Sequence, residues 1–290
     1  MIAICLTLLI YNLVVVGVYL LADYLAFGLD KGVEMNILPN INKRESFWAM
    51  LKQVVGIFFV LTLVLFVLAF VIKLSGGVIF KGLIIFIFWT AAFNFAYFLN
   101  IKFKPIKITL QIIMATVVTA AWVVFPSWLT LDIAGLIVIL WALANCKTLT
   151  FKQVLVLLIA VMIYDVVAVF GTGVMQIVAL GAVKMHLPLM LTIPQSFSLA
   201  SSALFKIGLG DIVLPGLMIM IAFREGRQRR LPAVSWATIG GYIVGGLVTV
   251  TILFLTHVPQ PATIYLVPGV LIGFILVAWR HKFLREAWFD

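Results

Sequence analysis

The stretch FKIGLGDIVLPGLMIMIAFR, residues 205–224, decides the fold because it combines the apolarity of a membrane segment with an aspartate. Gly208 and Gly210 precede Asp211, and glycine allows the backbone to loosen. Pro215 follows four residues later and has no N–H to donate to the Asp211 carbonyl. Irregular backbone at membrane depth is tolerated only where it is buried in protein or lines a wet cavity. The stretch therefore predicts a membrane-spanning segment whose backbone departs from regular helix next to a carboxylate.

The composition of the whole chain predicts an integral, multi-pass membrane protein in a lipid bilayer. Of its 290 residues, 65% are hydrophobic and 10% are charged, whereas a soluble domain has about half apolar and about a quarter charged residues. The net charge of +10 is attributed to basic loops rather than to nucleic-acid binding. The three histidines are scattered and the two cysteines have no zinc spacing, so we expect no metal and no cofactor.

Hydropathy predicts an all-α bundle of nine transmembrane helices. The expected spans are residues 2–28, 52–72, 78–98, 108–126, 129–145, 152–172, 205–223, 233–256 and 262–280. Residues 1–145 are expected to form a scaffold of five helices, and residues 146–290 a second part made of the four spans six to nine. The segment 173–204, with Pro188 and Pro194, either extends the sixth helix or lies along the membrane surface.

Basic residues predict the orientation of the chain. Sixteen of the 20 Lys and Arg residues lie in the loops after spans one, three, five and seven and in the C-terminal tail. The opposite side carries only Lys73, Lys81, Lys184 and Lys206. Because Lys and Arg accumulate in cytoplasmic loops, the N-terminus is predicted outside and the C-terminus in the cytoplasm.

Four aspartates fall within predicted spans, and two of them are deep. Asp23 and Asp132 lie near span ends, where a solvated or capping role is expected. Asp165 lies 13 residues after Lys152, about 20 Å from the cytoplasmic side, and Asp211 lies 6 residues after Phe205, about 9 Å from the outer side. In a hydrocarbon core of about 30 Å these depths nearly coincide. Two consecutive antiparallel helices therefore bring Asp165 and Asp211 to one level.

A facing pair of carboxylates has two candidate chemistries. Like charges at close range do not both ionise easily, so the pair shares one proton and can activate water as an aspartic protease does. The alternative is a proton-coupled transporter or cation leak that uses the same pair. The depth of the two aspartates in the membrane does not distinguish a protease from a transporter or cation leak.

Three motifs resemble those of the signal peptide peptidase family of intramembrane aspartyl proteases, which are related to presenilin. Tyr164–Asp165 matches the family's Tyr-Asp motif, and Gly208, Leu209, Gly210 and Asp211 match its Gly-x-Gly-Asp motif. Pro261, Ala262 and Thr263 stand at the family's Pro-Ala-Leu motif, with Thr263 in place of leucine. The resemblance is specific across roughly residues 128–280.

The resemblance implies a nine-helix fold of the presenilin type and an aspartic endopeptidase that cleaves within membranes. Asp165 and Asp211 carry over as the catalytic dyad. Active-site shaping and substrate positioning are expected of the motif residues around them, namely Tyr164, Gly208, Leu209, Gly210, Pro261, Ala262 and Thr263. The implied substrates are transmembrane or signal-peptide helices, and a homo-oligomer is left open. The location is the plasma membrane in a prokaryote, or the endoplasmic reticulum or another endomembrane in a eukaryote.

Overall fold

A computed structural model describes most of the chain from residue 78 onward and part of the chain before it. The described residues are 14–25, scattered positions between 52 and 70, 78–102, 107–144, 149–171, 174–194, 203–256, 260–284 and 286. Most of the predicted span 52–72, much of the span 2–28 and residues 195–202 lie outside the described residues.

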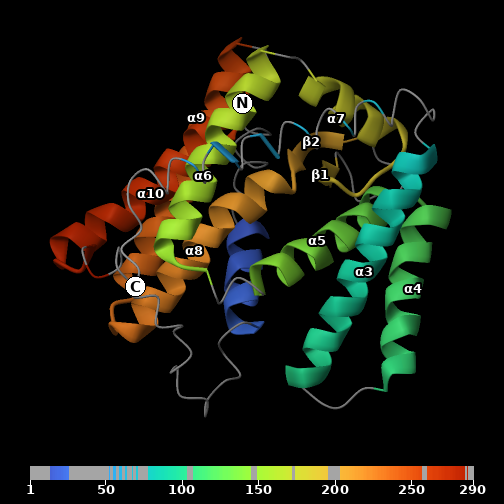
Figure 1. The fold of residues 1–290 in the computed structure, drawn as a ribbon, viewed down its shortest axis with the longest axis horizontal. Coiled ribbons are helices and arrows are strands. Elements are labelled where there is room, and N and C mark those ends of the chain that lie inside the picture. Colours follow the sequence, from blue (N-terminus) through green and yellow to red (C-terminus); the bar gives the residue numbers. More distant parts are fainter. Residues whose placement is uncertain are drawn as a thin grey trace. The chain divides into compact units, whose positions relative to one another are not determined.

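Helices dominate the described residues (Figure 1). They are Val14–Asp23, α3 (Val78–Lys102), α4 (Ile108–Val124), α5 (Trp128–Ala144), α6 (Phe151–Val166) with the π-helical turn η3 (Val167–Gly171), α7 (Val174–Lys184), α8 (Gly210–Gln228), α9 (Ala233–Thr256) and α10 (Thr263–Arg280). One antiparallel hairpin pairs β1 (Met190–Pro194) with β2 (Ala203–Gly208).

The helices support the predicted helical membrane protein. Within the described ranges, Phe151–Gly171, Ala233–Thr256 and Thr263–Arg280 are long and apolar enough to cross a bilayer. Large apolar side chains are exposed along several helices, among them Leu255 and Leu276. Such side chains suit contact with lipid rather than with water.

The all-α prediction is wrong where the hairpin forms. Residues 205–208 were expected to begin the seventh span, but they belong to β2, and the helix begins only at Gly210. The segment 173–204 was expected to extend the sixth helix or to lie along the membrane surface, and within it the structure describes a separate helix, α7, and the strand β1. The physical reason is pairing between distant residues: Met190 lies opposite Gly208 and Ile193 opposite Phe205, which an apolar run alone does not reveal.

Three helices end in the same way, with a basic residue in the left-handed backbone region. His186, Arg230 and Lys282 have φ of 50°, 53° and 59°. After α7, for example, the His186 N–H donates to the Val183 carbonyl and the Leu187 N–H donates to the Ala182 carbonyl. This Schellman arrangement satisfies the last helical carbonyls, and a basic side chain there suits the negative end of the helix dipole.

The chain forms two compact units. Unit 1 comprises residues 1–29, 66–145 and 174–213, and unit 2 comprises residues 30–65, 146–173 and 214–290. In unit 1, α3, α4 and α5 pack together and α5 lies against β1. Trp122 is 1% exposed and packs edge-on against Phe88, with ring centroids 6.2 Å apart.

In unit 2, α9 and α10 form the closest pair, and α6 packs on α10 (Figure 1). Glycines allow this contact: a Cβ added at Gly241 would lie 2.0 Å from the Gly269 carbonyl oxygen, and one added at Gly273 would lie 2.3 Å from that of Ala237. Small residues permit such close approach of membrane helices. The close packing of α9 on α10 therefore holds α10, including its first turn, in a fixed position.

Candidate active site

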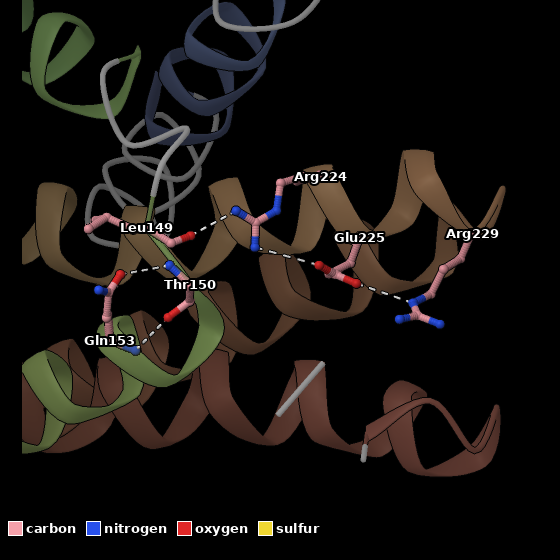
Figure 2. A network of polar contacts seen from close by, with 6 residues as sticks. All are labelled: Leu149, Thr150, Gln153, Arg224, Glu225 and Arg229. Carbon is pink, nitrogen blue, oxygen red and sulfur yellow. Dashed lines mark hydrogen bonds and ion pairs between the residues drawn. The ribbon is translucent and has the colours of Figure 1, made fainter. Parts of the chain in front are cut away.

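Helix α6 carries Asp165 and is fixed at its start. The Thr150 hydroxyl accepts from the Gln153 backbone N–H, and the Gln153 side chain accepts from the Thr150 N–H, which forms a capping box. The Arg224 guanidinium, from α8, donates to the Leu149 carbonyl at 2.7 Å (Figure 2). These bonds anchor the beginning of α6 to the end of α8 within unit 2.

A network of charges continues from this anchor (Figure 2). Glu225, 2% exposed, pairs with Arg224 at 3.6 Å and with Arg229 at 3.2 Å. Arg229 also pairs with Glu286 at 2.6 Å and lies 4.5 Å from the centre of the Phe283 ring. Burial of Arg229 acts to lower its pKa. The hydrogen bonds to Glu286 and Glu225 have the larger combined effect and raise the pKa of Arg229 above its usual value. The network holds Phe283 and Glu286 next to the end of α8.

Asp165 is the second-last residue of α6, which is followed by the π-helical turn η3. Its Oδ2 accepts a hydrogen bond from the Thr263 hydroxyl at 2.5 Å. Thr263 is 2% exposed and is the first residue of α10. The positive end of the α10 dipole therefore lies next to this carboxylate, which favours negative charge there.

The turn before α10 is also ordered by hydrogen bonds. The Pro261 carbonyl accepts from the Ile264 N–H at 3.3 Å, and the Ala262 carbonyl accepts from the Tyr265 N–H at 3.0 Å. The Tyr265 hydroxyl donates to the Gln260 side chain at 2.6 Å, across the turn. Two of the three predicted motif segments, Tyr164–Asp165 and Pro261–Thr263, are thus brought together in unit 2.

The third motif segment lies in unit 1 and links β2 to α8. The Leu209 N–H donates to the Leu189 carbonyl at 3.1 Å, and the Leu209 carbonyl accepts from the Val213 N–H at 2.9 Å. Asp211 stands in the first turn of α8, and a Cβ at Gly208 would lie 3.2 Å from its Oδ2. Glycine at 208 therefore leaves room for the Asp211 carboxylate. The pairing of Asp165 with Asp211 stays a prediction.

Tyr19 supports the Asp211 segment, and the sequence analysis missed it. It is fully buried, and its hydroxyl donates to the Ile212 carbonyl at 2.8 Å, next to Asp211. It is 193 residues from its partner, so no local pattern signals the contact.

Gly135 is a second missed residue. A Cβ at this position of α5 would lie 3.1 Å from the side chain of Leu209 and 3.2 Å from that of Leu191. The absence of a side chain at Gly135 lets Leu209 and the hairpin lie close to α5. Nearby, Asp132 accepts from the Thr192 N–H at 2.8 Å and so ties β1 to α5, a role that differs from the solvated or capping carboxylate expected there.

Comparison with known proteins places the chain in a family. A profile described as signal peptide peptidase matches residues 1–290. The chain belongs to the signal peptide peptidase family. Its similarity to signal peptide peptidase-like 2A from Mus musculus is 30% identity over 207 residues, covering 64% of this chain and 40% of the relative. The human protein of the same name is 31% identical over 192 residues, covering 59% of this chain and 37% of the relative.

The fold agrees with this family assignment. A solved structure of a presenilin family intramembrane aspartate protease superposes with a TM-score of 0.61 at 22% identity, covering 93% of this chain and 96% of that one. The chain spans about two fifths of the length of the mouse and human relatives. This member of the signal peptide peptidase family is therefore an integral membrane protein, mostly helical, with the presenilin-type fold.

Proposed function

We propose that the protein is an aspartic endopeptidase that hydrolyses peptide bonds within transmembrane or signal-peptide helices. The observation that carries the proposal is the family match over the entire chain, because it includes Asp165, Asp211 and the turn 261–263. The partly buried bond between Thr263 and Asp165 supports it, since it places the Asp165 carboxylate against the turn that the family motif specifies.

The proposed orientation has nine spans, the N-terminus outside and the C-terminus in the cytoplasm. The asymmetry of Lys and Arg between the two sides supports this orientation. Residues 1–145 act as the scaffold, and residues 146–290 carry the catalytic residues. Asp165 and Asp211 then lie at one depth in the outer half of the bilayer.

In the proposed reaction the two carboxylates share one proton. The ionised aspartate takes a proton from water as the water attacks the peptide carbonyl, and the protonated aspartate donates to the carbonyl oxygen. Because the pair titrates as a unit, the acid and base roles belong to the pair rather than to one fixed carboxylate. The chemistry requires no metal and no cofactor.

A helical substrate must unwind before water reaches its carbonyls, since those groups are bonded within the helix. Residues 195–207 are the proposed region for receiving the unwound segment, and the strand β2 supports this because an extended edge can accept an added strand. The opposite strand, β1, already bonds Asp132 through Thr192, which leaves β2 as the better receiving edge. Tyr164, Gly208, Leu209, Gly210, Pro261, Ala262 and Thr263 shape the site around the dyad.

The test is cleavage of a signal-peptide-like helix by the purified protein in liposomes, with the products identified by mass. We expect cleavage within the apolar part of the helix, and no cleavage by Asp165→Asn or Asp211→Asn variants that still fold. A transition-state mimic of aspartic proteases should compete with the substrate. Proton or cation flux through the same liposomes, without peptide cleavage, would favour the transporter alternative instead.

A further inference from the structure

We infer that Thr263 is a positioning residue for Asp165, whose hydroxyl orients the carboxylate and stabilises its ionised form. This inference rests on the proposed protease function. It concerns the position at which this chain departs from the Pro-Ala-Leu motif of its family.

The hydrogen bond itself is the first argument. The Thr263 hydroxyl donates to Asp165 Oδ2 at 2.5 Å, within the range of O–H to carboxylate bonds. Thr263 is 2% exposed and the bond is partly buried, so water has little access to the donating hydroxyl. A donor held against one carboxylate oxygen limits rotation of the side chain and favours the charged state of the group.

The contrast with other threonines of unit 2 is the second argument. In α9 the hydroxyls of Thr238, Thr249, Thr251 and Thr256 all donate to the carbonyl four residues earlier in the same helix. Thr263 is the first residue of α10, so it has no preceding helical turn to bond. Its hydroxyl can therefore donate to a group on another helix, and it donates to Asp165 on α6.

The support behind Thr263 is the third argument. Phe151, at the start of α6, stacks on Phe274 of α10 with centroids 5.0 Å apart. At the other end of the same pair, Asp165 bonds Thr263. The two helices therefore run antiparallel and touch at two points, separated along α6 by 14 residues or about 21 Å. Close packing of α10 on α9 through glycines also restricts movement of α10.

These observations predict that leucine, the residue of the family motif, is a poor substitute for Thr263 in this chain. A leucine at position 263 fills the site but donates no hydrogen bond from its side chain. In this chain, Thr263→Leu should therefore lower activity, although it restores the Pro-Ala-Leu motif. Valine has nearly the shape of threonine and lacks the hydroxyl, whereas serine keeps the hydroxyl and loses the methyl group.

The experiment compares Thr263→Val, Thr263→Ser and Thr263→Leu with the unsubstituted protein in the liposome cleavage assay. We expect Thr263→Val and Thr263→Leu to lose about 10- to 100-fold in kcat, the effect of removing a hydrogen bond to a charged group, with KM changed much less. Thr263→Ser should retain kcat within a few-fold. The acidic limb of the kcat/KM profile should move to higher pH in Thr263→Val. Tyr164, the titratable neighbour of Asp165 on α6, and Asp211, its proposed partner, are unchanged in all variants.

Thr238→Val is the matched control, because Thr238 is buried and its hydroxyl bonds only its own helix. This variant should keep kcat and the pH profile. Thermal unfolding of each variant shows whether an activity loss comes from the fold. If Thr263→Val cleaves as fast as the unsubstituted protein with the same pH profile, the inference is wrong while the proposed function stands. If the unsubstituted protein does not cleave any helix, the proposed function itself fails.

Discussion

The contact between α9 and α10 makes a sharp prediction for two adjacent glycines. A Cβ at Gly241 would lie 2.0 Å from the Gly269 carbonyl oxygen, whereas one at Gly240 meets nothing within 4 Å. Ordinary contact begins at 3.4 Å, so Gly241→Ala forces the two backbones apart by about 1.4 Å. The atoms nearest the added Cβ are backbone atoms of Gly269 and Val270, so no flexible side chain can move aside to relieve the contact.

The expected cost follows from this displacement. Overpacking of a fitted interface costs roughly 1–3 kcal/mol. The same displacement moves α10, which carries Thr263 in its first turn, and we expect a shift of this size to disturb the bond between Thr263 and Asp165. Gly240→Ala should instead be neutral or stabilising by up to about 1 kcal/mol, because alanine is the better helix former.

The assay is thermal unfolding of the purified variants in one detergent, followed by cleavage of the reporter helix in liposomes. Gly241→Ala should unfold at a temperature several degrees lower and lose most of its activity, and Gly240→Ala should do neither. Equal stability and equal activity of the two variants would refute the close packing of α9 on α10.

Two further predictions concern the Asp211 segment. Gly135→Val places branched atoms where Leu209 and Leu191 already lie within 3.2 Å of an added Cβ, so cleavage should fall sharply, while Gly82→Val on α3, with open space around it, should leave cleavage unchanged. Unaltered cleavage by Gly135→Val would show that α5 does not position Leu209. Tyr19→Phe removes the buried bond to the Ile212 carbonyl and should lower the free energy of unfolding by about 0.5–1.5 kcal/mol, whereas Tyr24→Phe, at a half-exposed position, should not. Identical melting temperatures of the two tyrosine variants would contradict the role given to Tyr19.

The sequence predicts the parts of this protein that depend on local pattern. Spans such as 108–126, 233–256 and 262–280 agree with α4, α9 and α10 to within two residues, because bilayer thickness dictates the length of an apolar run. Hydropathy also predicts that Asp165 and Asp211 lie deep at one level, and this stays a prediction.

What the sequence does not predict depends on contacts between distant residues. The hairpin needs Met190–Pro194 to meet Ala203–Gly208, and the apolar pattern of either segment alone does not indicate this pairing. The Thr263 hydroxyl finds Asp165 across 98 residues, and Tyr19 finds Ile212 across 193. Gly135 matters only because Leu209 comes to lie over it.

The central claim is that Asp165 and Asp211 act as one pair, and cysteine cross-linking tests it most directly. The variant would carry Asp165→Cys and Asp211→Cys in a chain whose Cys5 and Cys146 are replaced by alanine. A disulfide requires Cα atoms within about 7 Å of each other, and a short thiol cross-linker extends that reach slightly.

Two control pairs calibrate the measurement. Asp165→Cys with Thr263→Cys should cross-link, because these residues are in contact. Asp165→Cys with Met218→Cys should not, since Met218 lies seven residues beyond Asp211 along α8, about 10 Å farther. We predict that the 165–211 pair cross-links as readily as the 165–263 pair. Cross-linking of 165 to 263 but not to 211, in the membrane and with a substrate helix present, would contradict the account.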